Sequence, residues 1–202
     1  MVKDNNRLER KKSNTREKIF STAIKLFKNK GYENTTVDEI VEKADVAKGT
    51  FFNYFPTKSS LLIYLNTKRV ENLKALIIEE FNKNPLSTKE KISKLIELMA
   101  RDIEKDIELS KFIILESLRF YGDIFNEETA INYEFIYILQ NIIEEGKKNQ
   151  DVSKQVDSMM LAEIIAGTYI YTVFLWLSAK RETSVYQKLK SKIDLLLDSL
   201  LS

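Results

Sequence analysis

The sequence predicts an all-α protein of about nine helices, with a small N-terminal head and a larger helical body. Its 202 residues include only 5 glycines and 2 prolines, the residues that most often interrupt helices. Apolar residues recur at spacings of three and four over long stretches, and no alternating strand pattern stands out. A hydrophobic content of 44% is ample for a buried core.

The head is predicted to be a domain of residues 1–60 that begins with an amphipathic helix. This helix is expected to start near Asn14, whose side chain can cap it together with Glu17, and to stop at Gly31 in a left-handed conformation. Its inner side carries Ile19, Phe20, Ala23, Ile24, Leu26 and Phe27.

Two short helices are predicted to follow. Thr36 and Glu39 form a capping box that opens a helix of little more than two turns. After a brief turn, the segment "KGTFFNYF" forms a helix from Lys48, which Pro56 brings to an end.

The body is predicted to be a helical domain of residues 61–202. Its first helix begins slightly before that boundary, and Ser87 with Glu90 provides a second capping box. Helices are expected at about 58–81, 88–105, 110–122, 127–146, 155–179 and 184–201.

The composition argues against three classes of protein: an enzyme, a metal sensor and a membrane protein. The chain has no cysteine and no histidine, so the usual thiol nucleophile, general base and commonest metal ligands are missing. The N-terminus carries no apolar signal segment, and the apolar run 164–179 is shorter than the roughly 20 residues of a spanning helix. We expect a cytoplasmic protein without a cofactor, a metal or a membrane partner.

The charge distribution points to a basic head on an acidic body. Residues 1–60 hold 13 Lys/Arg against 8 Asp/Glu, and residues 61–202 hold 19 against 22. A nucleic-acid-binding module joined to a different domain has this pattern, although solvated surfaces also produce it.

The predicted head has a short helix, a tight turn and a second short helix, all packed on a preceding helix. This is the layout of a helix-turn-helix DNA-binding domain. On a helix starting at Lys48, Phe51 and Phe55 share one face and are expected to anchor it in the core. The opposite face is expected to meet a double-stranded DNA operator through base edges and phosphates. The predicted DNA-binding residues are Thr36, Lys48, Gly49, Thr50, Asn53, Tyr54 and Lys58, and arm residues Arg7, Arg10, Lys11, Lys12 and Arg16 could add contacts.

The stretch "TTVDEIVEKADVAKGTFFNYFPTKSSLL" resembles the DNA-binding signature of TetR/AcrR-type transcriptional regulators. The matching residues are Ala44, Val46, Gly49, Thr50, Tyr54, Phe55, Lys58 and Leu61. The resemblance implies a homodimeric, ligand-responsive regulator, most often a repressor that leaves a palindromic operator when its effector binds.

Three positions depart from that signature. Asp45 replaces the turn glycine, a change that the tolerance of Asp for left-handed geometry can accommodate. Ala47 replaces the serine that would cap the reading helix, which removes that cap unless another group supplies it. Phe52 replaces a tyrosine and cannot donate a hydrogen bond to phosphate.

The resemblance also implies roles for the body. The helices at about 155–179 and 184–201 are expected to form the dimer interface, although the same apolar residues could simply close the monomer core. Aromatic and polar residues of the middle helices could line a pocket for a bulky, largely apolar effector. The predicted effector-binding residues are Phe112, Leu115, Glu116, Arg119, Phe120, Tyr133, Tyr137 and Tyr169.

The alternative to a DNA-binding regulator is a helical protein-interaction module whose basic head docks an acidic partner. The two functions differ in DNA binding at low salt, where even non-specific binding is visible. An enzyme is the least favoured class, since no phosphate-binding glycine loop or evident acid pair is present.

Overall fold

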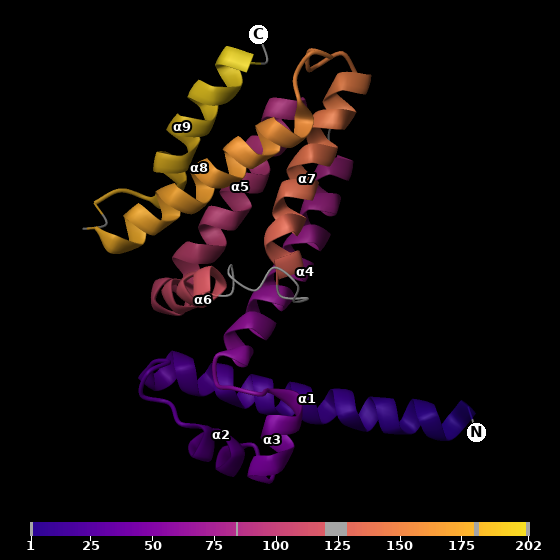
Figure 1. The fold of residues 1–202 in the computed structure, drawn as a ribbon, viewed down its shortest axis with the longest axis vertical. Helices are drawn as coiled ribbons and strands as arrows, with labels where there is room; N and C mark the ends of the chain where they lie inside the picture. The colour runs from indigo at the N-terminus through magenta and orange to yellow at the C-terminus, as the bar shows by residue number, and fades with distance from the viewer. Residues whose placement is uncertain (1, 84, 120–128, 180–181, 201–202) are drawn as a thin grey trace. The chain divides into compact units, whose positions relative to one another are not determined.

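The computed structural model describes residues 2–83, 85–119, 129–179 and 182–200, with side chains at residues 10, 12–83, 85–116, 134–179 and 182–198. Within these ranges the chain forms nine α-helices and no strand, which confirms the predicted all-α fold (Figure 1). The helices are α1 (Val2–Lys30), α2 (Val37–Lys43), α3 (Lys48–Tyr54), α4 (Ser60–Lys83), α5 (Thr88–Lys105), α6 (Ile107–Arg119), α7 (Thr129–Lys148), α8 (Ser158–Ser178) and α9 (Val185–Leu200).

The chain divides into two compact units. The first consists of Met1–Asn66 together with Glu108–Glu116, and the second of Thr67–Ile107 together with Ser117–Ser202. The predicted division after residue 60 assigns all of α6 to the body, whereas Glu108–Glu116 of α6 belongs to the first unit. That stretch is far from the head in sequence, so only tertiary packing reveals where it belongs.

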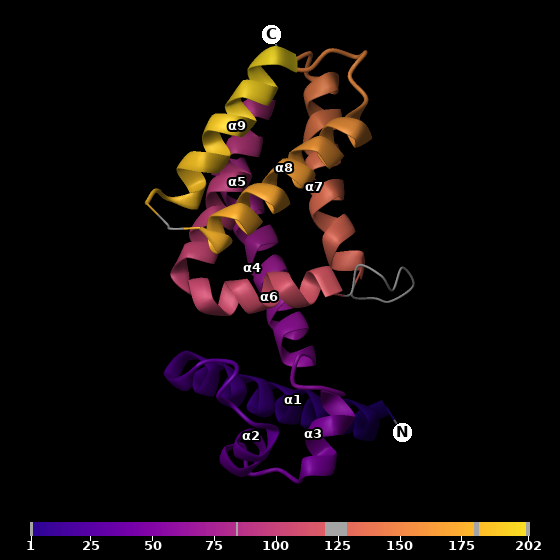
Figure 2. The same cartoon turned by 60° about the vertical axis from the view of Figure 1, so that its left-hand side comes forward.

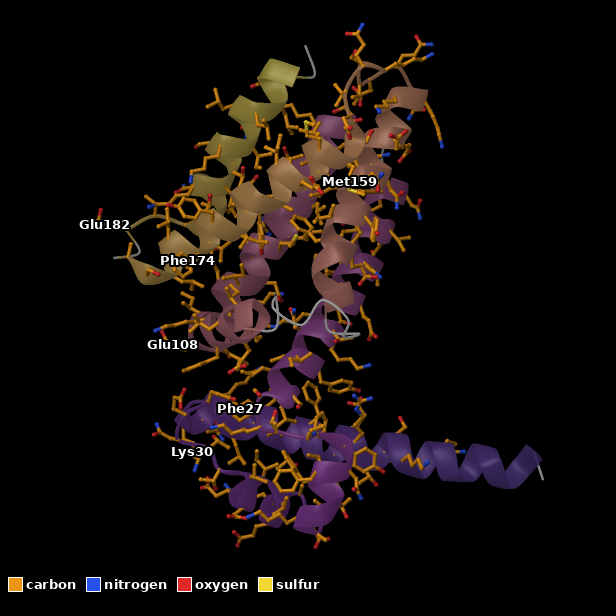
Figure 3. All side chains as sticks on the ribbon, viewed as in Figure 1. Phe27, Lys30, Glu108, Met159, Phe174 and Glu182 are labelled. Atoms are coloured by element: carbon orange, nitrogen blue, oxygen red, sulfur yellow. The ribbon has the colours of Figure 1, made fainter. Side chains whose placement is uncertain are left out.

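In the first unit, α1, α2 and α3 gather around one apolar core (Figure 2). Phe51 and Phe55 of α3 are among its largest fully buried side chains. The part of α6 that belongs to this unit adds Leu109 and Ile113. The remaining buried members of the core are Ile19, Ala23, Leu26, Phe27, Tyr32, Ile40, Ala44, Leu61 and Leu62, of which Phe27 is labelled in Figure 3.

Local signals fix the ends of α2. The Thr36 hydroxyl accepts a hydrogen bond from the Glu39 N–H at 3.2 Å, and the Glu39 carboxylate accepts one from the Thr36 N–H at 3.1 Å, so the predicted capping box is present. Gly31 has φ 87° and Asp45 has φ 48°, the left-handed conformations expected before and after α2.

The predicted start of α1 near Asn14 is wrong. The helix begins at Val2 and passes through Asn14 without interruption. Of residues 2–13, seven are Arg, Lys, Glu or Leu, which are good helix formers and favour extension of the helix. A cap residue therefore marks a helix start only where the preceding residues disfavour a helix.

In the second unit, α5 packs against α7 and α9, and α8 packs against the same two helices. Polar groups from neighbouring elements close the helix ends: the Val185 N–H donates to Glu104 Oε1 at 2.8 Å, and the Thr88 N–H donates to Asp151. Trp176 Nε1 donates to the Thr183 carbonyl at 2.7 Å and holds the turn between α8 and α9.

Helix α8 is apolar on all sides. Among the described helices, it is the one with the length and composition of a membrane span, and 44% of its most apolar window is buried in the protein. A core helix has the same composition, and α8 packs against α7 and α9. The expected absence of a membrane partner stays a prediction.

Gly146 of α7 is required by packing. A Cβ built on it would lie 2.7 Å from Val152 Cγ2 and closer still to Thr88 Oγ1. We predict that Gly146→Ala lowers the free energy of unfolding by about 1–3 kcal/mol, because the added methyl group overpacks a close contact. Urea denaturation measures this change.

Gly49→Ala is the matched control, since a Cβ at Gly49 meets nothing within 4 Å. It should leave stability unchanged or raise it by up to about 1 kcal/mol through helix propensity. Equal stability of the two variants would contradict the assigned contact.

Candidate nucleic-acid interface and effector body

Helix α3 presents two different faces. Phe51 and Phe55 are 0% and 1% exposed and lie in the core of the first unit, as predicted. Gly49, Phe52 and Asn53 are exposed on the opposite side. Two buried phenylalanines thus hold a short helix so that its small and polar residues face outward, the arrangement that a DNA-reading helix needs.

The N-terminus of α3 lacks a side-chain cap. Ala47 occupies the N-cap position, and no side chain hydrogen-bonds to the first turn from there. Backbone hydrogen bonds close the first turn, with the Thr50 and Phe51 N–H groups donating to the Ala47 carbonyl at 2.9 and 3.2 Å. The missing cap costs about 1 kcal/mol, which the burial of Phe51 and Phe55 has to offset.

Lys48 and Thr36 are both exposed and both engaged within the head. Lys48 Nζ lies 2.6 Å from Asp38 Oδ1, which ties the first turn of α3 to α2. Thr36 uses its hydroxyl in the capping box. An exposed ion pair of this kind contributes little stability, so Lys48 can exchange Asp38 for a phosphate at small cost.

Three further predicted residues lie on or beside the outer face of α3. Thr50 is partly buried, and Asn53 is exposed and does not belong to the core cluster. Tyr54 is partly buried and packs against the core. Their roles in base and phosphate contact stay predictions.

The structure gives Lys58 a role that the sequence did not suggest. Its Nζ donates to the carbonyls of Tyr32 at 2.9 Å and Thr35 at 3.0 Å, and lies 4.1 Å from the centre of the Tyr32 ring. Two of its three N–H groups therefore hold the loop between α1 and α2. One N–H remains for the predicted phosphate contact.

The basic arm is helical, and its described side chains differ in environment. Arg10 and Lys12 are exposed. The guanidinium of Arg16 lies 4.1 Å from the Tyr64 ring centre and 5.6 Å from that of Phe55, so its planar face covers the core. The side chains of Arg7 and Lys11 lie outside the described residues.

Glu39 is the most perturbed carboxylate of the head. Hydrogen bonds from Lys30 and from the Thr36 N–H, in that order of effect, lower the pKa of Glu39 to about 2. Because the pKa is lowered on folding, this stabilisation of α2 is present above the ordinary carboxylate pKa and is lost as the pH falls toward 2. Glu39 is therefore charged throughout the physiological range.

The predicted effector-binding residues are divided between the two units, and their role in effector binding stays a prediction. Phe112 belongs to the first unit, where its ring centre lies 5.0 Å from that of Tyr32, and Glu116 belongs to the same unit. Leu115 and Tyr137 are exposed, at 42% and 52%. The side chains of Arg119, Phe120 and Tyr133 lie outside the described residues.

Tyr169 belongs to the second unit, where it is partly buried. Its ring centre is 5.3 Å from that of Phe135 on α7. Burial raises the pKa of its hydroxyl, the Asp102 carboxylate adds to the rise, and Arg69 opposes it. Arg69 Nε and Asp102 Oδ2 form an ion pair at 3.5 Å between α4 and α5.

Sequence reasoning missed this polar group of Arg69, Asp102 and Tyr169. Its members come from three helices and share no local motif, so no spacing in the sequence could reveal it. The described residues contain no group of three or more His, Cys, Asp or Glu side chains suited to a metal ion.

Two family models cover nearly the whole chain. Residues 19–65 match the model of bacterial regulatory proteins of the tetR family, and residues 67–199 match the model of the C-terminal region of YsiA-like proteins. The chain belongs to the TetR family. The predicted resemblance is thereby confirmed, and it extends from the head through the body.

Relatives of known role are similar along most of their length. The fatty acid metabolism regulator protein of Bacillus subtilis is 24% identical over 182 residues, which cover 90% of this chain and 93% of that protein. The structure of the TetR family repressor FadR of Thermus thermophilus with lauroyl-CoA has a TM-score of 0.76 at 21% identity, covering 93% and 95% of the two chains.

A third comparison gives the same fold. FadR of Bacillus subtilis, in complex with stearoyl-CoA, has a TM-score of 0.71 at 24% identity, covering 91% of this chain and 98% of that one.

Membership in the TetR family makes this protein a DNA-binding transcriptional regulator, and its first unit is the helix-turn-helix domain. The family is one of regulators rather than enzymes. The alternative of a protein-interaction module is not favoured. The exposed face of α3 is therefore the surface to test for DNA contact.

We predict that Lys58→Met lowers the free energy of unfolding by about 1–3 kcal/mol, since two carbonyls lose a charged donor. Chemical denaturation of the full-length protein measures this. Lys12→Met, at an exposed arm position, is the control and should leave stability unchanged. Phosphate contact would instead be the main role of Lys58 if two results were found together. The variant would be as stable as wild type, and the slope of its DNA affinity against salt concentration would fall by about one released ion.

Proposed function

We propose that this protein is a homodimeric transcriptional repressor that releases its operator when a long-chain fatty acyl effector, in the form of an acyl-CoA, binds the second unit. The observation that supports this most is the likeness of the whole chain to regulators of fatty acid metabolism, two of them with acyl-CoA bound. Such a protein acts on chromosomal DNA, and we place it in the cytoplasm.

The head supports the DNA-binding half of the proposal. α3 holds Gly49 and Asn53 on an exposed face while Phe51 and Phe55 fix the helix in the core. One helix of seven residues contacts few base pairs. A dimer places two such helices in successive major grooves and reads a palindrome.

The body supports an effector with an apolar part and a polar end. Buried residues of the second unit are mainly aliphatic, as suits an acyl chain. Arg69, Asp102 and Tyr169 add one polar group among them. An acyl thioester combines these two characters better than a sugar phosphate does.

We assign the dimer interface to α8 and α9. The exposed apolar residues of α8 follow helical spacing, so they form one stripe, with Leu195 exposed on α9 at 75%. A monomer would leave this stripe in water, whereas a second copy would bury it. The stripe consists of Met160, Ile164, Tyr171, Phe174 and Leu175, of which Phe174 is labelled in Figure 3.

Gly167 lies within this stripe. It is exposed in the middle of α8, and a Cβ on it would meet nothing within 4 Å of the same chain. No described residue of the protomer comes close enough to require a glycine here, although a glycine in a helix costs about 1 kcal/mol relative to alanine. A closely approaching helix of a second copy would explain it.

Two helices, α4 and α6, run through both units and can transmit the effect of effector binding to the DNA-binding head. α4 contributes residues up to Asn66 to the first unit and the rest to the second, and α6 is likewise divided between the units. An effector that binds two arrangements of the second unit unequally shifts the arrangement of the heads through these continuous helices.

The effector assignment predicts release of DNA by acyl-CoA. Retardation of the DNA upstream of the protein's own gene should occur at low salt, and lauroyl-CoA or stearoyl-CoA should weaken this binding about tenfold or more, within the usual range of allosteric coupling. Free coenzyme A, which lacks the acyl chain, is the control. Equal release by free coenzyme A, or no release by either acyl-CoA, would contradict the acyl assignment.

The interface assignment predicts that Gly167→Leu dissociates the dimer, because the added side chain keeps the two α8 helices apart. Analytical ultracentrifugation should show a dissociation constant raised by about tenfold or more, as a loss of 1.4 kcal/mol or more would give. Asn141→Leu adds the same side chain on the exposed surface of α7 and should leave the dimer intact. An unchanged dimer in the Gly167 variant would place the interface elsewhere.

A further inference from the structure

We propose that Phe52 is a specificity-determining residue of the operator complex, and that its ring recognises the C5-methyl group of thymine in the major groove. The inference rests on the DNA-binding function of the head. It assigns a reading role to the residue of α3 where a hydrogen-bonding tyrosine would be expected.

The Phe52 side chain is 43% exposed, while its neighbour in sequence, Phe51, is 0% exposed. Phe52 belongs neither to the buried core of the first unit nor to the partly buried residues packed against it. The fold therefore gains little from this ring. Phenylalanine is also a weaker helix former than most residues, so local helix stability does not favour it either.

The ring is nevertheless in contact with the core on one side. Its centre lies 5.3 Å from that of Phe51, with an interplanar angle of 87°, which is an edge-to-face contact. Phe51 lies in the core, so the exposed part of the Phe52 ring forms an apolar surface beside it. A side chain restricted by such a contact loses less conformational entropy on binding than an unrestricted one.

The neighbours of Phe52 make its surface accessible to a duplex. Gly49, three residues earlier on the same side of α3, carries no side chain, and a Cβ there would meet nothing within 4 Å. Asn53 is exposed beside it. The outer face of α3 therefore combines an open backbone, an amide and an apolar ring.

The chemistry of the major groove selects one apolar target for such a ring. Thymine presents its C5-methyl group there, whereas the other three bases present hydrogen-bonding groups that a phenyl ring cannot satisfy. An amide such as that of Asn53 suits adenine. We therefore expect Phe52 to favour thymine at one position of each half-site.

The test begins with parallel selection of operators from a random duplex library by the full-length wild-type protein and by Phe52→Ala. Wild type should enrich thymine at one position of each half-site, and Phe52→Ala should lose that preference alone. Deoxyuridine, which lacks only the methyl group, is then placed at that position. Wild-type affinity should fall about fourfold for each half-site, the factor expected for one buried methyl group, and the affinity of Phe52→Ala should not change.

Controls separate this role from a general effect on the head. Phe52→Tyr keeps the ring and should keep the thymine preference, and thermal unfolding should show that both variants fold like wild type. Equal sensitivity of wild type and Phe52→Ala to deoxyuridine would overturn the proposal. A uniform loss of affinity for all sequences in Phe52→Ala would also overturn it, since that result indicates a structural role.

If wild type and Phe52→Ala enrich the same specific sequences equally, the role of Phe52 is refuted. The proposed regulatory function is left intact by that result. Enrichment of no sequence by either protein would instead count against operator binding itself, and would overturn both proposals.

Discussion

The DNA-reading face depends on the burial of two phenylalanines, Phe51 and Phe55. α3 has seven residues and no side-chain cap, so it is too short to be stable as an isolated helix. Full burial of both rings against α1 and α2 supplies the stabilisation that its own sequence lacks. Every contact proposed for Gly49, Phe52 and Asn53 requires that anchor, since it decides which side of α3 meets solvent.

Basic side chains pack directly on the aromatic core that holds α3. Arg16 lies over the Phe55 and Tyr64 rings, and Lys58 lies over Tyr32 while it bonds to two loop carbonyls. Basic residues that look like free DNA contacts in the sequence are thus partly structural. The electrostatic excess of the head therefore overstates the number of cations that are free to meet phosphate.

Local features of the fold could be predicted from the sequence, and long-range ones could not. Thr36 and Glu39 are three residues apart and form the capping box that their spacing predicts, and Asp45 takes the left-handed conformation expected of it. Phe112 was expected in the body, but it packs with Tyr32 because a stretch of α6 folds into the first unit. The partners of Lys58 are more than twenty residues away, and no pattern within one helix could identify them.

The same holds for Arg69 and Asp102, which pair across α4 and α5 only after folding, and for Tyr169 of α8, whose pKa their charges influence. The outer face of α3, by contrast, follows from helical periodicity together with the burial of two rings, and it carries the central claim of this account. The most direct measurement is the operator affinity of a Thr50→Ala, Asn53→Ala double variant whose thermal unfolding matches wild type. We expect a loss of about tenfold or more and a relaxed sequence preference, since each good base contact discriminates by about 1–3 kcal/mol. Unchanged affinity and preference in a folded double variant would contradict it.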